Sequence, residues 1–143
     1  MKKDVIGMVR LILSPPFPFK LNFELWSREI AEIRNIPVEN QCEVSAFCWA
    51  PNTGVKVIPY IYRAIRQCTK TLHKSLLLAA IDQKQIPILQ SQMFPLHICG
   101  DSKHYMGSDT IPLFMKSIEI IDTLSKENPQ LFQFVEKELD TLR

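Results

Sequence analysis

Ten prolines divide this chain of 143 residues into short segments, and only four glycines accompany them. A proline ends or kinks a helix and cannot donate a hydrogen bond inside a central strand, so these positions set boundaries between elements. Ser14-Pro15-Pro16 ends the apolar stretch 5–13, and Pro37 stops the helical pattern before it. The scarcity of glycine disfavours a phosphate-binding loop, and neither GxxxxGK[ST] nor GxGxxG occurs.

The composition is that of a globular protein, with 46% hydrophobic and 22% charged residues. Its length fits a single domain over residues 1–143. The formal net charge of +2 is too small to imply nucleic-acid or membrane binding by itself. No apolar run approaches the roughly 18 residues of a membrane-spanning helix, so we expect no membrane association and a cytoplasmic or nuclear location.

The four cysteines support an intracellular location. They form no CxxC pair and no dense disulfide framework, and a domain of this length does not need disulfides. We therefore expect reduced thiols, most of them buried. The cysteines are Cys42, Cys48, Cys68 and Cys99.

A helix is predicted over residues 22–34, where apolar side chains recur at helical spacing and form one stripe. Asn22 is placed to cap its start. Glu24 precedes Arg28 by four residues, an order that adds roughly 0.2–0.5 kcal/mol to a helix. The earlier stretch 5–13 fits a helix or a buried strand equally well.

A β-hairpin is predicted from two strands, residues 42–50 and 54–58, because Pro51–Gly54 between them has the composition of a tight turn. Side chains alternate between the faces of a strand, which puts Phe47 opposite Val44. Both faces of the hairpin are then apolar.

Apolar residues keep helical spacing from residue 60 to residue 83, and Pro59 suits a first helical turn. We therefore predict one continuous helix over 60–83. Residues 86–90 and 94–99 contain proline and are predicted as edge strands. A polar loop over residues 100–109 follows them.

The predicted fold class is α+β. A small, mostly antiparallel sheet is built around the 42–58 hairpin, and a C-terminal helical hairpin closes one side. A mainly α fold is the alternative if residues 5–13 and 86–99 do not form strands. The predicted helices cover residues 22–34, 60–83, 110–125 and 129–142.

Basic residues concentrate in the middle of the chain, where Asp82 is the single acid between Lys56 and Lys84. On the predicted helix, the cations of segment 63–74 stack at spacings of three and four residues. Such a ridge would follow a phosphate backbone, although a solvated helix face also carries these residue types. The residues assigned to this nucleic-acid-binding face are Lys56, Arg63, Arg66, Lys70 and Lys74.

A second cluster of reactive side chains occupies residues 97–104. Strand alternation puts His97 and Cys99 on one face, and His104 follows in the loop. Imidazoles and thiolates are zinc ligands, and a thiol beside an imidazole is a nucleophile. The spacing matches no ligand pattern, so we assign no catalytic residue, metal or cofactor.

Three functional hypotheses follow. The first is a non-enzymatic interaction module or complex subunit that buries apolar surface on a protein partner or on a second copy of itself. The second is a nucleic-acid-associated protein that uses the basic face 63–74. The third is a small enzyme or metal-binding protein centred on residues 97–104.

Overall fold

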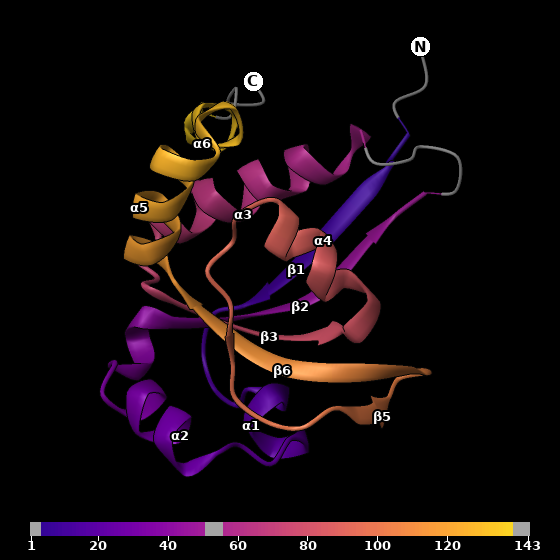
Figure 1. Ribbon diagram of the computed structural model, residues 1–143, viewed down its shortest axis with the longest axis vertical. Helices are drawn as coiled ribbons and strands as arrows, with labels where there is room; N and C mark the ends of the chain where they lie inside the picture. Colours follow the sequence, from indigo (N-terminus) through magenta and orange to yellow (C-terminus); the bar gives the residue numbers. More distant parts are fainter. Residues whose placement is uncertain (1–3, 51–55, 139–143) are drawn as a thin grey trace.

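The computed structural model describes residues 4–50 and 56–138. Its centre is a mixed sheet of six strands in the order β1-β2-β3-β6-β4, and β5 also pairs with β6 (Figure 1). β2 and β3 are parallel, and the other pairs are antiparallel. The strands are β1 (Gly7–Ile12), β2 (Gln41–Trp49), β3 (Leu76–Asp82), β4 (His97–Ile98), β5 (Lys103–Tyr105) and β6 (Ser108–Lys116).

Helices cover both faces of the sheet (Figure 1), which confirms the predicted α+β class. One face carries α1 and α2, and the other carries α3 to α6. The helices are α1 (Pro18–Asn22), α2 (Ser27–Arg34), α3 (Ile58–Thr71), α4 (Ile86–Ser91), α5 (Ser117–Glu127) and α6 (Pro129–Glu136), with 3-10 turns at Val38–Asn40 and Gln83–Gln85. None of the helices in the described ranges is long and apolar enough to cross a membrane.

The predicted hairpin is only half present. β2 confirms the strand over residues 42–50, but its partners are β1 and β3. Residues 51–55, which contain the predicted turn, lie outside the described residues, and Ile58 already belongs to α3. A strand with apolar side chains on both faces belongs inside a sheet covered on both sides, which explains why β2 has two neighbours. Because residues 5–13 contain the strand β1, the mainly α alternative fails.

The predicted helix over residues 60–83 is wrong in its second half. α3 ends at Thr71, His73 adopts a left-handed conformation with φ of 55°, and β3 follows. Leu76 and Leu78 are both 0% exposed, because β3 is a central strand covered on both faces. A continuous apolar run fits such a strand as well as a helix, so periodicity alone predicted the wrong element.

The predicted helix over residues 22–34 is confirmed only in its second part, α2, and a separate short helix, α1, precedes it. α1 begins at Pro18, where a missing N–H costs nothing, and ends at Asn22. The amide nitrogen of the Asn22 side chain donates to the carbonyl oxygen of Pro18 at 2.8 Å. Asn22 therefore closes α1 instead of capping the next helix, and α2 begins at Ser27.

Two further predictions assigned the wrong type of secondary structure. Residues 86–90 form the helix α4 instead of an edge strand, and residues 110–125, predicted as a helix, contain most of β6 and most of α5. The neighbouring residues Leu113 and Phe114 are both 0% exposed, since β6 is buried on both faces. Here too, a run of apolar residues suits a central strand.

The edge strand and the two C-terminal helices are confirmed in outline. β4 is a short edge strand within residues 94–99. The predicted polar loop over residues 100–109 is wrong in part, because it contains the strand β5 and the start of β6, which pair with each other. A strand with one face toward water can carry polar side chains. α5 and α6 are the two predicted C-terminal helices. The Asn128 side chain caps α6 by accepting a hydrogen bond from the Leu131 N–H at 3.4 Å.

Gly100→Ala is expected to lower the free energy of unfolding by about 1–3 kcal/mol, the usual cost of overpacking. A Cβ at Gly100 would lie 2.5 Å from the Glu24 carbonyl oxygen and 2.8 Å from Pro112 Cγ. Urea unfolding measures the change. The control Ser102→Ala, at an exposed position two residues along, is expected to stay within about 0.5 kcal/mol. Equal stability of both variants would contradict the close packing at Gly100.

Candidate functional site

A β-bulge in β2 changes which side chains face the helices α3 to α6. Val9 pairs with Phe47, and Leu11 pairs with Val44, so two residue steps on β1 oppose three on β2. The extra residue reverses the alternation along β2. As a result, Val44 and Phe47 both line the same cavity, whereas simple alternation places them on opposite faces. Glu43 faces the other way, and its carboxylate accepts a hydrogen bond from the Phe19 N–H at 2.6 Å.

The parallel pairing of β2 with β3 stops at the same place. It runs from Gln41 opposite Leu76 to Val44 opposite Ala79. β2 nevertheless continues to Trp49 and β3 to Asp82, with no further pairing between them in the described part of the chain. A bulge bends its strand and increases the local twist. The two strands therefore separate beyond Val44 and Ala79.

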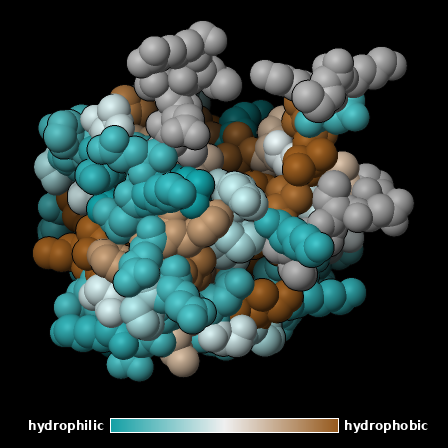
Figure 2. All heavy atoms as spheres, turned by 90° about the horizontal axis from the view of Figure 1, so that it is seen from above, coloured by the Kyte–Doolittle hydropathy of each residue, from teal (hydrophilic) through white to brown (hydrophobic). Residues whose placement is uncertain are grey.

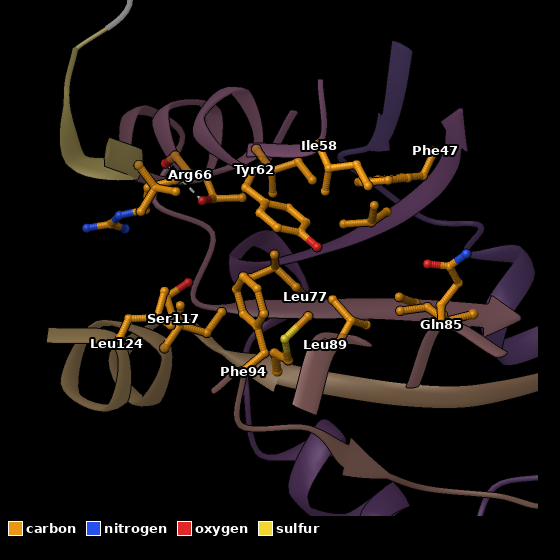
Figure 3. A pocket seen from close by; sticks show the side chains of 18 of the residues that line it. Phe47, Ile58, Tyr62, Arg66, Leu77, Gln85, Leu89, Phe94, Ser117 and Leu124 are labelled. Atoms are coloured by element: carbon orange, nitrogen blue, oxygen red, sulfur yellow. Dashed lines mark hydrogen bonds between the residues drawn. The ribbon is translucent and has the colours of Figure 1, made fainter. Parts of the chain in front are cut away.

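A cavity of about 390 Å³ opens at this separation. Its floor is the sheet face of β2, β3 and β6, and its walls come from α3, α4, α5 and α6. Figure 3 shows its length, with Phe47 and Gln85 at one end, Tyr62 and Phe94 in the middle, and Arg66 and Leu124 at the other. The volume suits a small-molecule site.

Aromatic rings surround the half of the cavity near the separated strands. The Tyr62 ring lies 6.0 Å from the Phe47 ring and 5.0 Å from the Phe94 ring, measured between centroids. Trp49 adds a ring 5.8 Å from Phe47. The opposite half is aliphatic, with Leu77, Met115, Ile120, Ile121, Leu124 and Val135. The interior is therefore suited to an elongated apolar ligand.

Tyr62 supplies the polar group in the middle of the cavity. Its hydroxyl donates to Gln92 Oε1 at 2.8 Å. Burial raises the pKa of the Tyr62 phenol to about 12, so the group stays protonated and uncharged at neutral pH. Asn128 holds the main chain at the same place, because its side-chain amide donates to the Gln92 carbonyl oxygen at 3.1 Å.

Asp82 and Gln85 bring polar side chains to the end of the cavity near β3. The Asp82 carboxylate accepts a hydrogen bond from the Lys84 N–H at 2.9 Å and is partly exposed. A partly exposed carboxylate beside an apolar cavity is placed to attract a cationic ligand group.

The basic residues predicted to form a nucleic-acid-binding face do not form one exposed ridge. Arg63 and Arg66 turn toward α6, where Arg63 Nε donates to the Phe134 carbonyl oxygen at 2.8 Å and Arg66 pairs with Glu136. Lys70 lies on the rim of the same pair, 4.0 Å from a Glu136 carboxylate oxygen. Their positive charge is directed largely at a carboxylate and carbonyls of the same chain.

The two other members of this set lie apart from these three. Lys74 is 9% exposed, and its ammonium donates to the carbonyl oxygens of Leu13 and Glu39 at 2.8 and 2.7 Å. It is separated from α3 because the predicted helix ends at Thr71. Lys56 is exposed beside a shallow hollow before α3.

The cluster at residues 97–104 is dispersed. His97 Nε2 lies 2.8 Å from Glu119 Oε1, and its ring stacks on Phe114. Cys99 is 0% exposed, and His104 is paired with Asp109 at the surface, with His104 Nδ1 3.5 Å from Asp109 Oδ1. The described residues contain no group of three or more His, Cys, Asp and Glu side chains that would hold a metal ion.

Burial also makes Cys99 a poor nucleophile. It raises the pKa of the Cys99 thiol to about 12 and that of the Cys42 thiol to about 11. The reactive species is the thiolate, which is scarce at neutral pH when the pKa lies this high. All four cysteines are free thiols, and only Cys48 and Cys68 are exposed.

Comparison with known proteins was informative only at the level of structure. No protein-family model matches the sequence, and no curated protein matches it. The CoA-dependent acyl-homoserine lactone synthase BjaI, solved with SAM and isopentyl-CoA, superposes with a TM-score of 0.64. The fold resembles that of acyl-homoserine lactone synthases. Sequence identity to BjaI is 14% over 93% of this chain, which spans 58% of the BjaI chain.

Two further synthases agree. The acyl-homoserine lactone synthase LasI has a TM-score of 0.64 at 12% identity and covers 96% of this chain and 67% of its own. FeeM, an N-acyl amino acid synthase from uncultured soil microbes, has a TM-score of 0.63 at 16% identity and covers 82% of this chain and 65% of its own. At these identities the likeness shows the fold, a GNAT-like arrangement.

These neighbours correct the functional predictions. The leading hypothesis, a non-enzymatic interaction module or complex subunit, is contradicted because the solved structures that this chain resembles are synthases. They give no support to the nucleic-acid hypothesis either. The enzyme alternative pointed to residues 97–104, whereas the cavity lies between β2, β3 and α3. Sequence reasoning missed Tyr62, Asp82 and Ala79 as lining residues, because no motif marks them.

Thiol labelling tests the burial of the cysteines. In the folded protein at pH 8, we expect the exposed Cys48 and Cys68 to react rapidly with a thiol reagent. Cys42 and Cys99 are expected to react only after unfolding, because burial shields both thiols and raises the pKa of each. Peptide mass spectrometry of alkylated protein assigns each site. Rapid labelling of Cys99 in the native state would revive the nucleophile hypothesis.

Proposed function

We propose that this protein is an acyltransferase, which moves an acyl group from a thioester carrier to the amino group of a small molecule. One observation carries the proposal: the sheet separates beyond Val44 and Ala79 and opens onto an elongated apolar cavity. The synthase fold of the neighbours supports it. This chain spans only part of the length of these synthases, 58% of BjaI and 65% of FeeM. We therefore carry the activity of the whole synthases to this chain as a proposal.

The apolar half of the cavity fits the acyl chain. Each buried methylene contributes about 0.8 kcal/mol to binding, so an aliphatic lining selects long apolar ligands over polar ones. The separated strands fit the carrier. Strand edges present main-chain donors and acceptors, and the amide groups of a carrier arm would pair with them as an added strand does.

The proposed reaction needs no cofactor beyond the acyl carrier. The bound ammonium group first releases one proton to water. The neutral amine nitrogen then attacks the thioester carbonyl carbon, a C–N bond forms, and the C–S bond breaks. The carrier leaves as a thiol, which takes up the proton that the amine loses. Atoms and charge balance, and the products are an amide and a free thiol.

The acceptor amine is placed near Asp82 and Gln85 in this proposal. A carboxylate favours a nearby ammonium group, as an amino-acid-like molecule would carry. The name of FeeM, an N-acyl amino acid synthase, supports an acceptor of this kind. The four free thiols fit a reducing compartment, and a cytoplasmic location is part of the proposal.

The direct test mixes the protein with an acyl-CoA and a set of amino acids and their lactones, and measures amide products by mass spectrometry. This readout avoids the protein's own thiols. We expect an acyl amide whose formation depends on the protein. Absence of product, together with absence of acyl-CoA binding, would refute the proposal.

Ala79→Leu is expected to weaken acyl-CoA binding by about tenfold or more, or ~1.4 kcal/mol. Ala79 is 2% exposed and lies where the two strands separate, so a larger side chain fills the cavity there. The fluorescence of Trp49, which lines the cavity, reports binding in a Trp26→Phe background.

Ala31→Leu is the matched control, since Ala31 is exposed on α2, across the sheet. Unchanged binding is expected for it. Equal affinity of the Ala79→Leu and Ala31→Leu proteins would exclude this cavity as the acyl site, provided that both have the circular dichroism spectrum of the parent protein.

A further inference from the structure

The geometry points to the Arg66–Glu136 ion pair as a gate that sets the length of acyl chain this protein accepts. This inference rests on the proposed function and concerns the end of the cavity farthest from the separated strands. Arg66 on α3 lies at that end (Figure 3). Its partner Glu136, at the end of α6, also lines the cavity. The chemistry changes there from an aliphatic wall to a pair of opposite charges.

α6 is held against α3 by polar contacts at its C-terminal turn. Arg63 Nε donates to the Phe134 carbonyl oxygen at 2.8 Å, and Gln67 Nε2 donates to the Val135 carbonyl oxygen at 3.0 Å. Carbonyls in the last turn of a helix lack the usual helical partner, and these two donors from α3 bind there; the Phe134 carbonyl oxygen also accepts from the Lys137 N–H at 3.4 Å. The Arg63 guanidinium also lies 3.7 Å from the centroid of the Phe134 ring.

The apolar side of α6 faces inward. Phe132 and Val135 line the cavity, and Val135 is 4% exposed. The position of α6 therefore decides how far the cavity extends. Seen from above, the molecule has hydrophilic side chains over much of this face, with hydrophobic ones between them (Figure 2).

Arg66 and Glu136 complete this attachment at the cavity itself. Arg66 Nε donates to Glu136 Oε1, and a second guanidinium nitrogen lies 3.5 Å from Oε2. A two-point contact fixes orientation as well as distance. Their side chains are 17% and 25% exposed, so the pair lies at the boundary between the cavity and solvent. Two further polar groups lie beside the pair: Thr69 Oγ1 donates to the Arg66 carbonyl oxygen at 3.1 Å, and Lys70 Nζ lies 4.0 Å from Glu136 Oε2.

An acyl chain gains affinity along the aliphatic lining and loses it at the ion pair. Each methylene that is buried improves binding roughly fourfold. A methylene pressed against the pair displaces water from two charges without replacing its hydrogen bonds, which is unfavourable. At the ~30 Å³ that a water-sized group occupies, a cavity of about 390 Å³ holds roughly a dozen non-hydrogen atoms. Because the acceptor occupies part of this volume near Asp82, we expect the optimum at an acyl chain shorter than about twelve carbons.

The test measures affinity for saturated acyl-CoAs from about six to about sixteen carbons, in steps of two, with the Trp49 fluorescence signal. For the parent protein, affinity is expected to rise roughly fourfold per methylene and then fall beyond the optimum. In Glu136→Gln, the loss of charge weakens the attachment of α6, and the optimum is expected to move at least one step toward longer chains.

Two further variants separate a gate from a structural contact. Asp122→Asn is the control, because it removes an acid from the exposed Lys126–Asp122 pair on α5, whose charged atoms are 3.0 Å apart. Neither residue lines the cavity, so the optimal acyl chain length of this variant is expected to stay unchanged. Arg66→Lys keeps the positive charge but loses the two-point contact, and it is expected to move the optimum in the same direction as Glu136→Gln.

The outcomes separate the gate from the proposed function. A parent protein that binds no acyl-CoA of any length refutes the acyltransferase proposal, and the gate with it. Binding whose optimum stays the same in Glu136→Gln and Arg66→Lys overturns the gate alone. A uniform loss of affinity at every chain length in both variants also overturns it, because the pair then only supports the fold.

Discussion

The β-bulge in β2 is the constraint on which the rest of the site depends. By adding one residue opposite β1 between Val44 and Phe47, it turns Phe47 toward α3. Pairing with β3 ends at the same residue, Val44. Without the bulge, Phe47 would share the face of Glu43, and β2 would be free to continue alongside β3 to the end of both strands. The cavity exists because the sheet is interrupted at this point.

α3 has two different functions in this structure. Its inward side contributes Ile58, Tyr62 and Ile65 to the cavity wall. Its polar side contributes Arg63, Arg66 and Gln67, which hold the end of α6. Residues three and four positions apart on one helix lie along the same ridge, so one ridge attaches the helix that closes the cavity. The cationic residues are therefore part of the architecture that encloses the cavity.

The sequence predicted the fold class better than the elements that compose it. Strand β2, the start of α3 and the two C-terminal helices follow from alternation, Pro59 and Asn128-Pro129. β3 and β6 were predicted as helices because their runs of apolar residues satisfy helical spacing as well as two-sided burial. Only tertiary context separates the two possibilities, since a central strand needs neighbours that the sequence does not reveal.

The candidate site was even harder to predict from the sequence than the elements of the fold. A bulge leaves no mark in the Ser45-Ala46 sequence, and the lining comes from β2, β3, β6 and four helices. The basic residues carried a real signal, because helical spacing correctly put Arg63, Arg66 and Lys70 along one side of α3. What the sequence lacked was the partner: Glu136 is 70 residues from Arg66 along the chain.

In the proposed reaction, an acyl thioester enters where β2 and β3 separate. The most direct measurement follows the backbone amide NMR signals of the labelled protein while acyl-CoA is added. We expect the largest shifts at Phe47, Ala80 and Ile81, beyond the last paired residues, and small shifts at Phe19 and Ile33 on the opposite face. Shifts concentrated on the α1 and α2 face, with those of Phe47 and Ile81 unchanged, would contradict the claim.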